Sequence, residues 1–232
     1  MSSTNVDLKG NHLVIAVPAY DGKVPIYWVE RFVELFRLSL TYEFKVSFNY
    51  QAHGALITNN RNIAVAQALE TDCTHLCFID SDILFDPKDL VKMMAVTAIK
   101  DEQYDIVCGP YPLKQDEPKF HCDTLDEQQP SRHGLWPIKA TGCGFMMIKR
   151  EVLDKMVKEY PELEYYNNFL ERTMWALFHQ MMTPRLDGTT RYLGEDVAFC
   201  KRAVDKGVKI WLDPRVKLGH IGTKTYDISL SS

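Results

Sequence analysis

The stretch THLCFIDSD (residues 74–82) decides the fold of this chain. Its apolar run, Thr74–Ile79, predicts a buried strand, and the run ends abruptly at Asp80 and Asp82. Two residues spaced i, i+2 on an extended chain project to the same side, ~6.5 Å apart along the backbone. Paired carboxylates there suit a divalent cation such as Mg²⁺ or Mn²⁺, which can bind a diphosphate through its open positions. The carboxyl edge of an open α/β sheet is also where such folds bind ligands.

The Asp-x-Asp pattern alone is weak evidence for a metal site, because 18 aspartates in 232 residues give roughly 1.4 matches by chance. Its context carries more weight. Asp86 is suited to cap a helix, Pro87 fits the first helical position, and Asp89 adds negative charge to the first turn. The alternative is an acidic loop that only caps this helix, and the pattern alone leaves it open.

Composition narrows the class of protein. The length of 232 residues and the hydrophobic fraction of 46% fit one α/β domain with a substantial core. A net charge of −4 argues against non-specific binding to nucleic acid. The six cysteines form no Cys-x-x-Cys pair, so we expect neither a zinc site nor disulfides, and buried free thiols at Cys77, Cys108, Cys143 and Cys200. The first apolar run, Leu13–Val17, is too short for a signal or transmembrane segment, so we expect a cytoplasmic protein.

The first half of the chain alternates between strand and helix patterns. Strands are expected at Leu13–Val17, Glu43–Asn49, Thr74–Ile79 and Asp105–Gly109. Helices are expected at Val24–Leu40, Thr58–Leu69 and Pro87–Ile99. This order predicts an α/β fold with a mainly parallel central sheet flanked by helices.

The second half is less regular. Tyr111–Trp136 is long and polar, and we expect a loop that acts as a lid. The other expected elements are a turn and strand at Gly142–Ile148, helices at Glu151–Tyr160, Tyr165–Met182 and Glu195–Lys206 (ended by Gly207), and strands at Val208–Leu212 and Arg215–Leu218. Tyr165, Tyr166, Phe169 and Trp175 fit a platform for sugar rings or a core-facing helix, and we expect Phe169 and Trp175 in the core.

Two further clusters follow or begin expected elements in the first half. Pro18-Ala19-Tyr20-Asp21 ends the first strand, where a ring could stack on a base and Asp21 could bind an imide or a ribose. Thr58–Asn62 begins a helix, a position that favours anions, and Arg61 could clamp an oxyanion. An ordinary strand-to-helix turn and simple helix capping are the respective alternatives.

The second half contributes two more. In Leu193–Asp196, Glu195 and Asp196 open a helix behind a glycine, where a carboxylate could act as a general base. Acids are also common in first helical turns without any such role. In Gly219–Lys224, His220 could ligate a metal and Lys224 could reach phosphates, although a lone histidine is more often structural. Asp80, Asp82 and His220 together would make an O, O, N ligand set suited to Mn²⁺ or Mg²⁺.

These motifs, in this order, resemble the GT-A superfamily of nucleotide-sugar-dependent glycosyltransferases. The resemblance runs from Leu13 to about Tyr226. The chain is also, more loosely, similar to small glycosyltransferases of large DNA viruses of algae, and that likeness would place the protein in the host cytoplasm. It rests on Pro18-Ala19-Tyr20, Arg61-Asn62, Ile79-Asp80-Ser81-Asp82, Gly142-Cys143-Gly144-Phe145, Gly194-Glu195-Asp196 and His220. Some relatives carry Trp-Gly-Gly before the Glu-Asp pair, whereas this chain has Tyr192-Leu193-Gly194, so acceptor preference does not transfer.

The resemblance implies a role for each motif residue. A single GT-A domain over 1–232 would have a nucleotide-binding half at about 11–109 and an acceptor-binding half at about 110–226. Pro18, Ala19, Tyr20 and Asp21 would line the nucleoside pocket, with Arg61, Asp80 and Ser81 at the nucleotide or donor sugar and Lys224 at the diphosphate. Asp80, Asp82 and His220 would hold Mn²⁺ or Mg²⁺, and Glu195 and Asp196 would meet the acceptor, with Asp196 as base if the enzyme inverts.

The expected activity is therefore transfer of a sugar from a nucleoside-diphosphate sugar, with UDP-sugars favoured, to a hydroxyl of a saccharide or glycan. A nucleotidyltransferase that makes nucleotide sugars is one alternative, although the stretch Ala19–Lys23 is poor in the glycines that such enzymes carry. A non-catalytic nucleotide- or carbohydrate-binding module is another.

Overall fold

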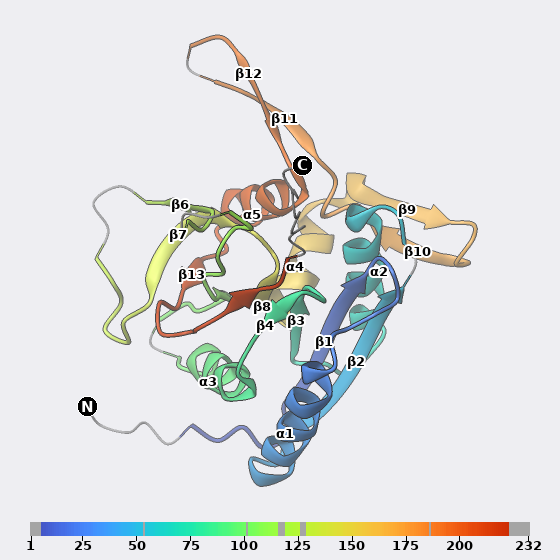
Figure 1. Ribbon diagram of the computed structural model, residues 1–232. Helices are drawn as coiled ribbons and strands as arrows, with labels where there is room; N and C mark the ends of the chain where they lie inside the picture. The colour runs from blue at the N-terminus through green and yellow to red at the C-terminus, as the bar shows by residue number, and fades with distance from the viewer. Residues whose placement is uncertain are drawn as a thin grey trace, which may run out of the picture.

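The chain folds around an eight-stranded sheet with strand order β2-β1-β3-β8-β5-β13-β7-β6 (Figure 1). The computed structural model describes residues 6–52, 54–100, 102–115, 119–125, 129–185 and 187–222. The strands of this sheet are β1 (His12–Ala19), β2 (Lys45–Ala52), β3 (His75–Ile79), β5 (Ile106–Cys108), β6 (Cys122–Thr124), β7 (Trp136–Thr141), β8 (Phe145–Lys149) and β13 (Ile210–Leu212).

The sheet is mainly parallel. Strand β1 pairs in parallel with β2 and β3, and β5 pairs in parallel with β13. Only β8 and β7 run against their neighbours, so six of the eight strands share one direction. The expected α/β class with a mainly parallel central sheet flanked by helices is confirmed.

Helices cover both faces of the sheet. Helices α2 (Ile57–Leu69), α4 (Arg150–Glu159) and α5 (Glu195–Asp205) pack into one hydrophobic cluster, and α1 (Tyr27–Thr41) and α3 (Pro87–Thr97) into the other. All residues of β1 and β3 are buried. Strands covered on both faces have continuous apolar sequences, so β1 and β3 could be predicted from the sequence.

Most expected elements are confirmed, with ends displaced by a few residues. Asp86 caps α3, because its Oδ1 accepts a hydrogen bond from the Lys88 amide at 2.9 Å and Pro87 follows it. Gly207, with φ of +75°, adopts the left-handed backbone expected just after α5. Helix α2 begins at Ile57, one residue before the expected Thr58, and no side chain caps it.

The expected helix at Tyr165–Met182 is wrong. Strands β9 (Glu164–Asn167) and β10 (Arg172–Trp175) form an antiparallel hairpin, and β11 (Met181–Pro184) pairs with β12 (Thr190–Leu193) in a second one. Aromatic and β-branched residues favour strands, and here that preference outweighs the helical spacing. Phe169 lies at the β9–β10 turn and is 93% exposed, so its expected core position is also wrong, whereas Trp175 packs against the core.

Two further expectations need correction. Arg215–Leu218 is not a strand, because Asp213 closes a turn by accepting a hydrogen bond from the Arg215 amide at 3.0 Å. The last strand is instead β14 (Gly219–His220), which pairs with β4 (Ile83–Leu84). The segment Tyr111–Trp136 is not a continuous loop, since it supplies β6, the edge strand that pairs with β7.

The six cysteines all lie within the described residues. All six are free, and those expected to be buried are buried. In the described ranges, no helix combines the length and apolar character that a membrane crossing requires.

A network of polar side chains around His12 connects segments at the amino edge of the sheet. The ring of His12 contacts Asp72 Oδ1 at 2.6 Å through Nδ1 and Ser47 Oγ at 2.7 Å through Nε2. Lys45 also contacts Asp72, at 3.2 Å. This Ser-His-Asp set joins β1, β2 and the segment before β3, at the edge opposite Asp80 and Asp82.

Candidate active site

The register of the sheet gathers the expected site residues at its carboxyl edge. Ala16 of β1 lies beside Phe78 of β3, so Pro18, near the end of β1, and Asp80, just after β3, lie at the same level of the sheet. Strand β8 runs the other way and begins at Phe145, opposite Ile79. The turn before it therefore reaches the same edge, where the Asp80 amide donates to the Gly144 carbonyl at 3.0 Å.

Arg61 is the centre of this edge. Its side chain is 2% exposed and lies between two carboxylates, with Nη2 at 3.3 Å from Asp80 Oδ1 and Nε at 3.4 Å from Asp196 Oδ1. The guanidinium also lies 5.3 Å from the ring centroid of Phe78. Burial lowers the pKa of Arg61, but Asp80 and Asp196 outweigh it and raise that pKa, so the cation stays charged.

The carboxylates around Arg61 retain unused bonding capacity. Burial raises the pKa of Asp80, and Arg61 only partly offsets this. Arg61 Nη2 donates a hydrogen bond to Asp80 Oδ2 at 3.4 Å, but the contacts with Asp80 Oδ1 and Asp196 Oδ1 lack hydrogen-bond geometry, and Arg61 Nη1 has no hydrogen-bond partner among the described residues. Buried polar atoms without partners are rare in native proteins, and a ligand is one recognised reason for them.

A second acidic contact lies beside this cluster. Pairing of β14 with β4 sets His220 next to Asp82, with Nε2 at 3.4 Å from Oδ2, and the Ile221 amide donates to the Asp82 carbonyl at 2.8 Å. His220 Nδ1 donates to the Pro112 carbonyl at 2.8 Å, so in a neutral ring the lone pair belongs to Nε2, the nitrogen that faces Asp82. Adjacent ligands of an octahedral ion lie ~3.0 Å apart when the bonds are ~2.1 Å. These two acceptor atoms therefore fit a shared cation.

The three expected metal ligands are not all brought together. Asp82 and His220 meet, whereas Asp80 is held against Arg61. Within the described ranges, no group of three His, Cys, Asp or Glu side chains is arranged to hold a metal ion. Further ligands would have to come from water or from a bound phosphate, as is usual for Mg²⁺ sites.

Glu195 and Asp196 occupy different environments at the start of α5. Asp196 is engaged by Arg61. Burial, and then the neighbouring Asp196, raises the pKa of Glu195, and its carboxylate makes no ion pair that the described residues reveal. A carboxylate with a raised pKa is the stronger proton acceptor.

The end of β1 has the expected position at this edge. Pro18 and Ala19 are buried, Tyr20 is 73% exposed, and Asp21 accepts a hydrogen bond from the Lys23 amide at 3.1 Å. The Tyr20 ring is thus free to stack on a planar ligand. Ser81 is partly buried between the two aspartates, and Lys224 lies outside the described residues.

Sequence reasoning missed Tyr111 as a site residue. Its hydroxyl accepts a hydrogen bond from the Gly144 amide at 3.3 Å, and its ring meets the His220 ring edge-on at 5.5 Å. A Cβ added at Gly142 would lie 2.0 Å from the Tyr111 hydroxyl, and one at Gly144 would lie 2.9 Å from Tyr111 Cζ. The signal was available, because Tyr111 closely follows a strand that ends at the carboxyl edge.

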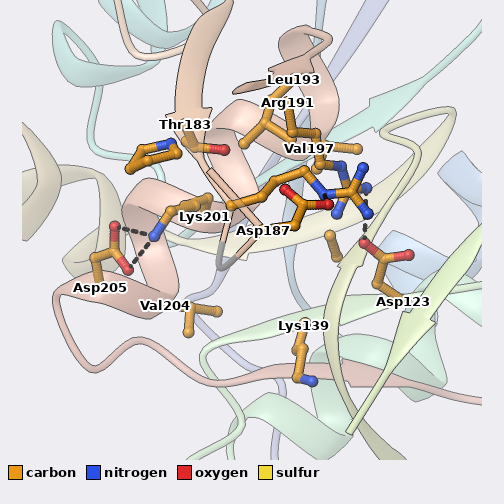
Figure 2. Close-up of a pocket in the computed structure, with 13 residues that line it drawn as sticks. Asp123, Lys139, Thr183, Asp187, Arg191, Leu193, Val197, Lys201, Val204 and Asp205 are labelled. Carbon is orange, nitrogen blue, oxygen red and sulfur yellow. Dashed lines mark hydrogen bonds and ion pairs between the residues drawn. The ribbon is translucent and has the colours of Figure 1, made fainter. Parts of the chain in front are cut away.

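A separate cavity is lined by residues of α5 and of the β11–β12 hairpin. This cavity of about 760 Å³ sits beneath the β11–β12 hairpin, which projects from the body of the molecule (Figures 1 and 2). Two ion pairs lie in its lining, Arg191 with Asp123 at 3.4 Å and Lys201 with Asp205 at 2.8 Å. None of the expected site residues that the structure describes lines it.

Comparison with solved structures gives an independent view of the fold. A197 from STIV superposes with a TM-score of 0.59 at 20% sequence identity, over 92% of this chain and 86% of that one. This chain shares the fold of A197. No protein-family model matches the sequence, and no curated protein matches it.

Two more distant structures align over most of the chain. GalNAc-T7 with UDP, GalNAc and Mn²⁺ has a TM-score of 0.49 at 12% identity, covering 94% of this chain and 44% of that one. An inositol-1-phosphate CTP transferase from T. maritima has a TM-score of 0.44 at 13% identity, covering 93% and 90%. Neither likeness is close enough to distinguish one activity from another.

Proposed function

We propose that this protein is a metal-dependent glycosyltransferase that moves a sugar from a nucleoside-diphosphate sugar, with UDP-sugars favoured, to a glycan hydroxyl. The observation that carries the proposal is the pairing of Asp82 with His220 beside the Arg61 cluster, at the carboxyl edge of the sheet. The motif order described for the sequence supports it. Residues 11–109 would bind the nucleotide, and residues 110–226 would bind the acceptor.

Asp82 and His220 would hold Mn²⁺ or Mg²⁺, which when bound neutralises the charge of the departing diphosphate. Pro18, Ala19, Tyr20 and Asp21 would form the nucleoside pocket, with the exposed Tyr20 ring stacked on the base. Arg61 would fix the Asp80 carboxylate toward the donor sugar, with Ser81 beside it, and Lys224 would contact the diphosphate.

The acceptor hydroxyl must lose a proton as it attacks the anomeric carbon. The resemblance implies that Asp196 is the base that accepts this proton, but Asp196 already forms an ion pair with Arg61. Glu195 has the raised pKa that strengthens a base, and we assign it the proton in an inverting reaction. Asp196 then serves to position Arg61 and the start of α5.

The first test is a thermal-shift screen of nucleotide sugars with and without Mn²⁺, because ligands that bind the native state raise its apparent stability. We expect a UDP-sugar to raise the melting temperature only when Mn²⁺ is present. Asp82→Asn and His220→Ala should abolish that shift and the transfer reaction. Asp154→Asn, an exposed carboxylate on α4, is the matched control and should change neither. Unchanged turnover in Asp82→Asn would reject the assignment.

Product analysis separates the proposal from its rivals. A nucleotidyltransferase would release pyrophosphate from a nucleoside triphosphate and a sugar phosphate, whereas we expect release of a nucleoside diphosphate from the donor. A non-catalytic module would bind the donor but leave it unconsumed across a broad panel of acceptors.

A further inference from the structure

The segment Tyr111–Lys114 contacts three parts of the proposed active site in succession: the turn before β8, His220 and Asp82. The Tyr111 hydroxyl accepts from the Gly144 amide, and the Pro112 carbonyl accepts from His220 Nδ1. Lys114 Nζ then donates to Asp82 Oδ2 at 2.5 Å. The chain leaving β5 therefore delivers a positive charge to the carboxylate that we assign to the metal.

The position of this ammonium conflicts with a bound cation. The Asp82 oxygen that Lys114 contacts is also the one that faces His220 Nε2. An ammonium group that donates to this oxygen uses one of its acceptor positions, and its charge repels a second cation. Lys114 and a divalent ion thus compete for Asp82.

A bound metal ion can displace Lys114 from Asp82. The Lys114 and Asp82 side chains are 45% and 36% exposed, and ion pairs this open to solvent stabilise a protein little. Lysine carries its charge on a long flexible stem, so Nζ can leave Asp82 without any change in the backbone. The freed ammonium would remain beside the place where a diphosphate meets the metal.

We propose that Lys114 holds the cation position on Asp82 in the nucleotide-free protein and passes to the diphosphate when metal and nucleotide bind. This inference rests on the proposed function, because it takes Asp82 as a metal ligand. It predicts that the metal alone binds weakly and that metal and nucleoside diphosphate strengthen each other's binding. Such coupling is reciprocal by thermodynamic necessity.

The test is Mn²⁺ binding, followed by the electron paramagnetic resonance signal of free Mn²⁺, with and without UDP. We expect Lys114→Gln to bind Mn²⁺ alone about tenfold more tightly than the unaltered protein, a change of about 1.4 kcal/mol. The gain in Mn²⁺ affinity on adding UDP should shrink by a similar factor. Lys158→Gln, an exposed lysine on α4, is the matched control and should behave as the unaltered protein does.

The outcomes separate this inference from the proposed function. Equal or weaker binding of Mn²⁺ by Lys114→Gln, in a protein that binds Mn²⁺ through Asp82, overturns the role of Lys114 alone. Failure of the unaltered protein to bind Mn²⁺ even with UDP, or binding that survives Asp82→Asn, overturns both. Tighter Mn²⁺ binding with a smaller UDP effect supports the exchange.

Discussion

Arg61 of α2 and Asp196 of α5 meet at 3.4 Å, although they come from opposite halves of the chain. With Asp80 at 3.3 Å on its other side, Arg61 joins the start of α2, the end of β3 and the start of α5. One buried cation therefore holds together the halves that we propose bind the nucleotide and the acceptor.

Replacing Arg61 by Met should destabilise the fold by about 3 kcal/mol, because removal of one partner leaves buried charge uncompensated. Urea unfolding followed by circular dichroism measures this. Arg61→Lys keeps the charge but loses the planar fork that reaches both carboxylates, and it should cost less than Arg61→Met. An unchanged urea midpoint in Arg61→Met would show that the cluster contributes nothing to stability.

The raised pKa of Glu195 should make the stability of the protein depend on pH. Burial raises the pKa of Glu195 in the folded protein above its ordinary value of 4.5, so the folded state binds this proton more tightly than the unfolded chain does. The resulting stabilisation is fully present below the unfolded pKa and is lost as pH rises through the folded pKa. Glu195→Gln should therefore raise the melting temperature relative to the unaltered protein more at pH 7 than at pH 4. The same increment at both values would contradict the raised pKa.

The close approach of Tyr111 to Gly142 predicts a non-additive pair of substitutions. Gly142→Ala would bring a methyl group within 2.0 Å of the Tyr111 hydroxyl, and overpacking of this kind costs about 1–3 kcal/mol. In a Tyr111→Phe background the clashing oxygen is gone, so the same substitution should cost less. A double-mutant cycle from denaturant unfolding measures the coupling. Gly222→Ala, whose methyl meets Lys114 alone among the described residues, at 3.5 Å, is the control. Additive costs would argue against this contact.

The β9–β10 hairpin predicts opposite outcomes for two neighbouring apolar residues. Phe169 is 93% exposed, so Phe169→Ser should change the free energy of unfolding by less than about 0.5 kcal/mol. Met174 is fully buried, and Met174→Ala should cost about 2–5 kcal/mol through the cavity it leaves. Thermal unfolding distinguishes this hairpin from the helix that the sequence favoured, in which Phe169 would also belong to the core.

Local patterns were enough to predict the first half of the fold. The buried runs of β1 and β3, and the Asp86-Pro87 start of α3, depend on neighbours along the chain, and the structure confirms them. The carboxyl-edge positions of Asp80 and of the end of β1 followed from the same strands, because parallel strands end together. Tyr165–Met182 was misread because aromatic residues at helical spacing also suit a hairpin, and only packing selects between the two.

What the sequence by itself determined was the class of fold and the residues that end its first strands. Only the tertiary structure decided which of those residues meet. Asp80 contacts Arg61, whereas Asp82 contacts His220 and Lys114. Glu195 has no ion-pair partner among the described residues. These choices depend on charge and burial between segments far apart in the chain, where the position of each ionic group is set by all its neighbours at once and no local pattern records it.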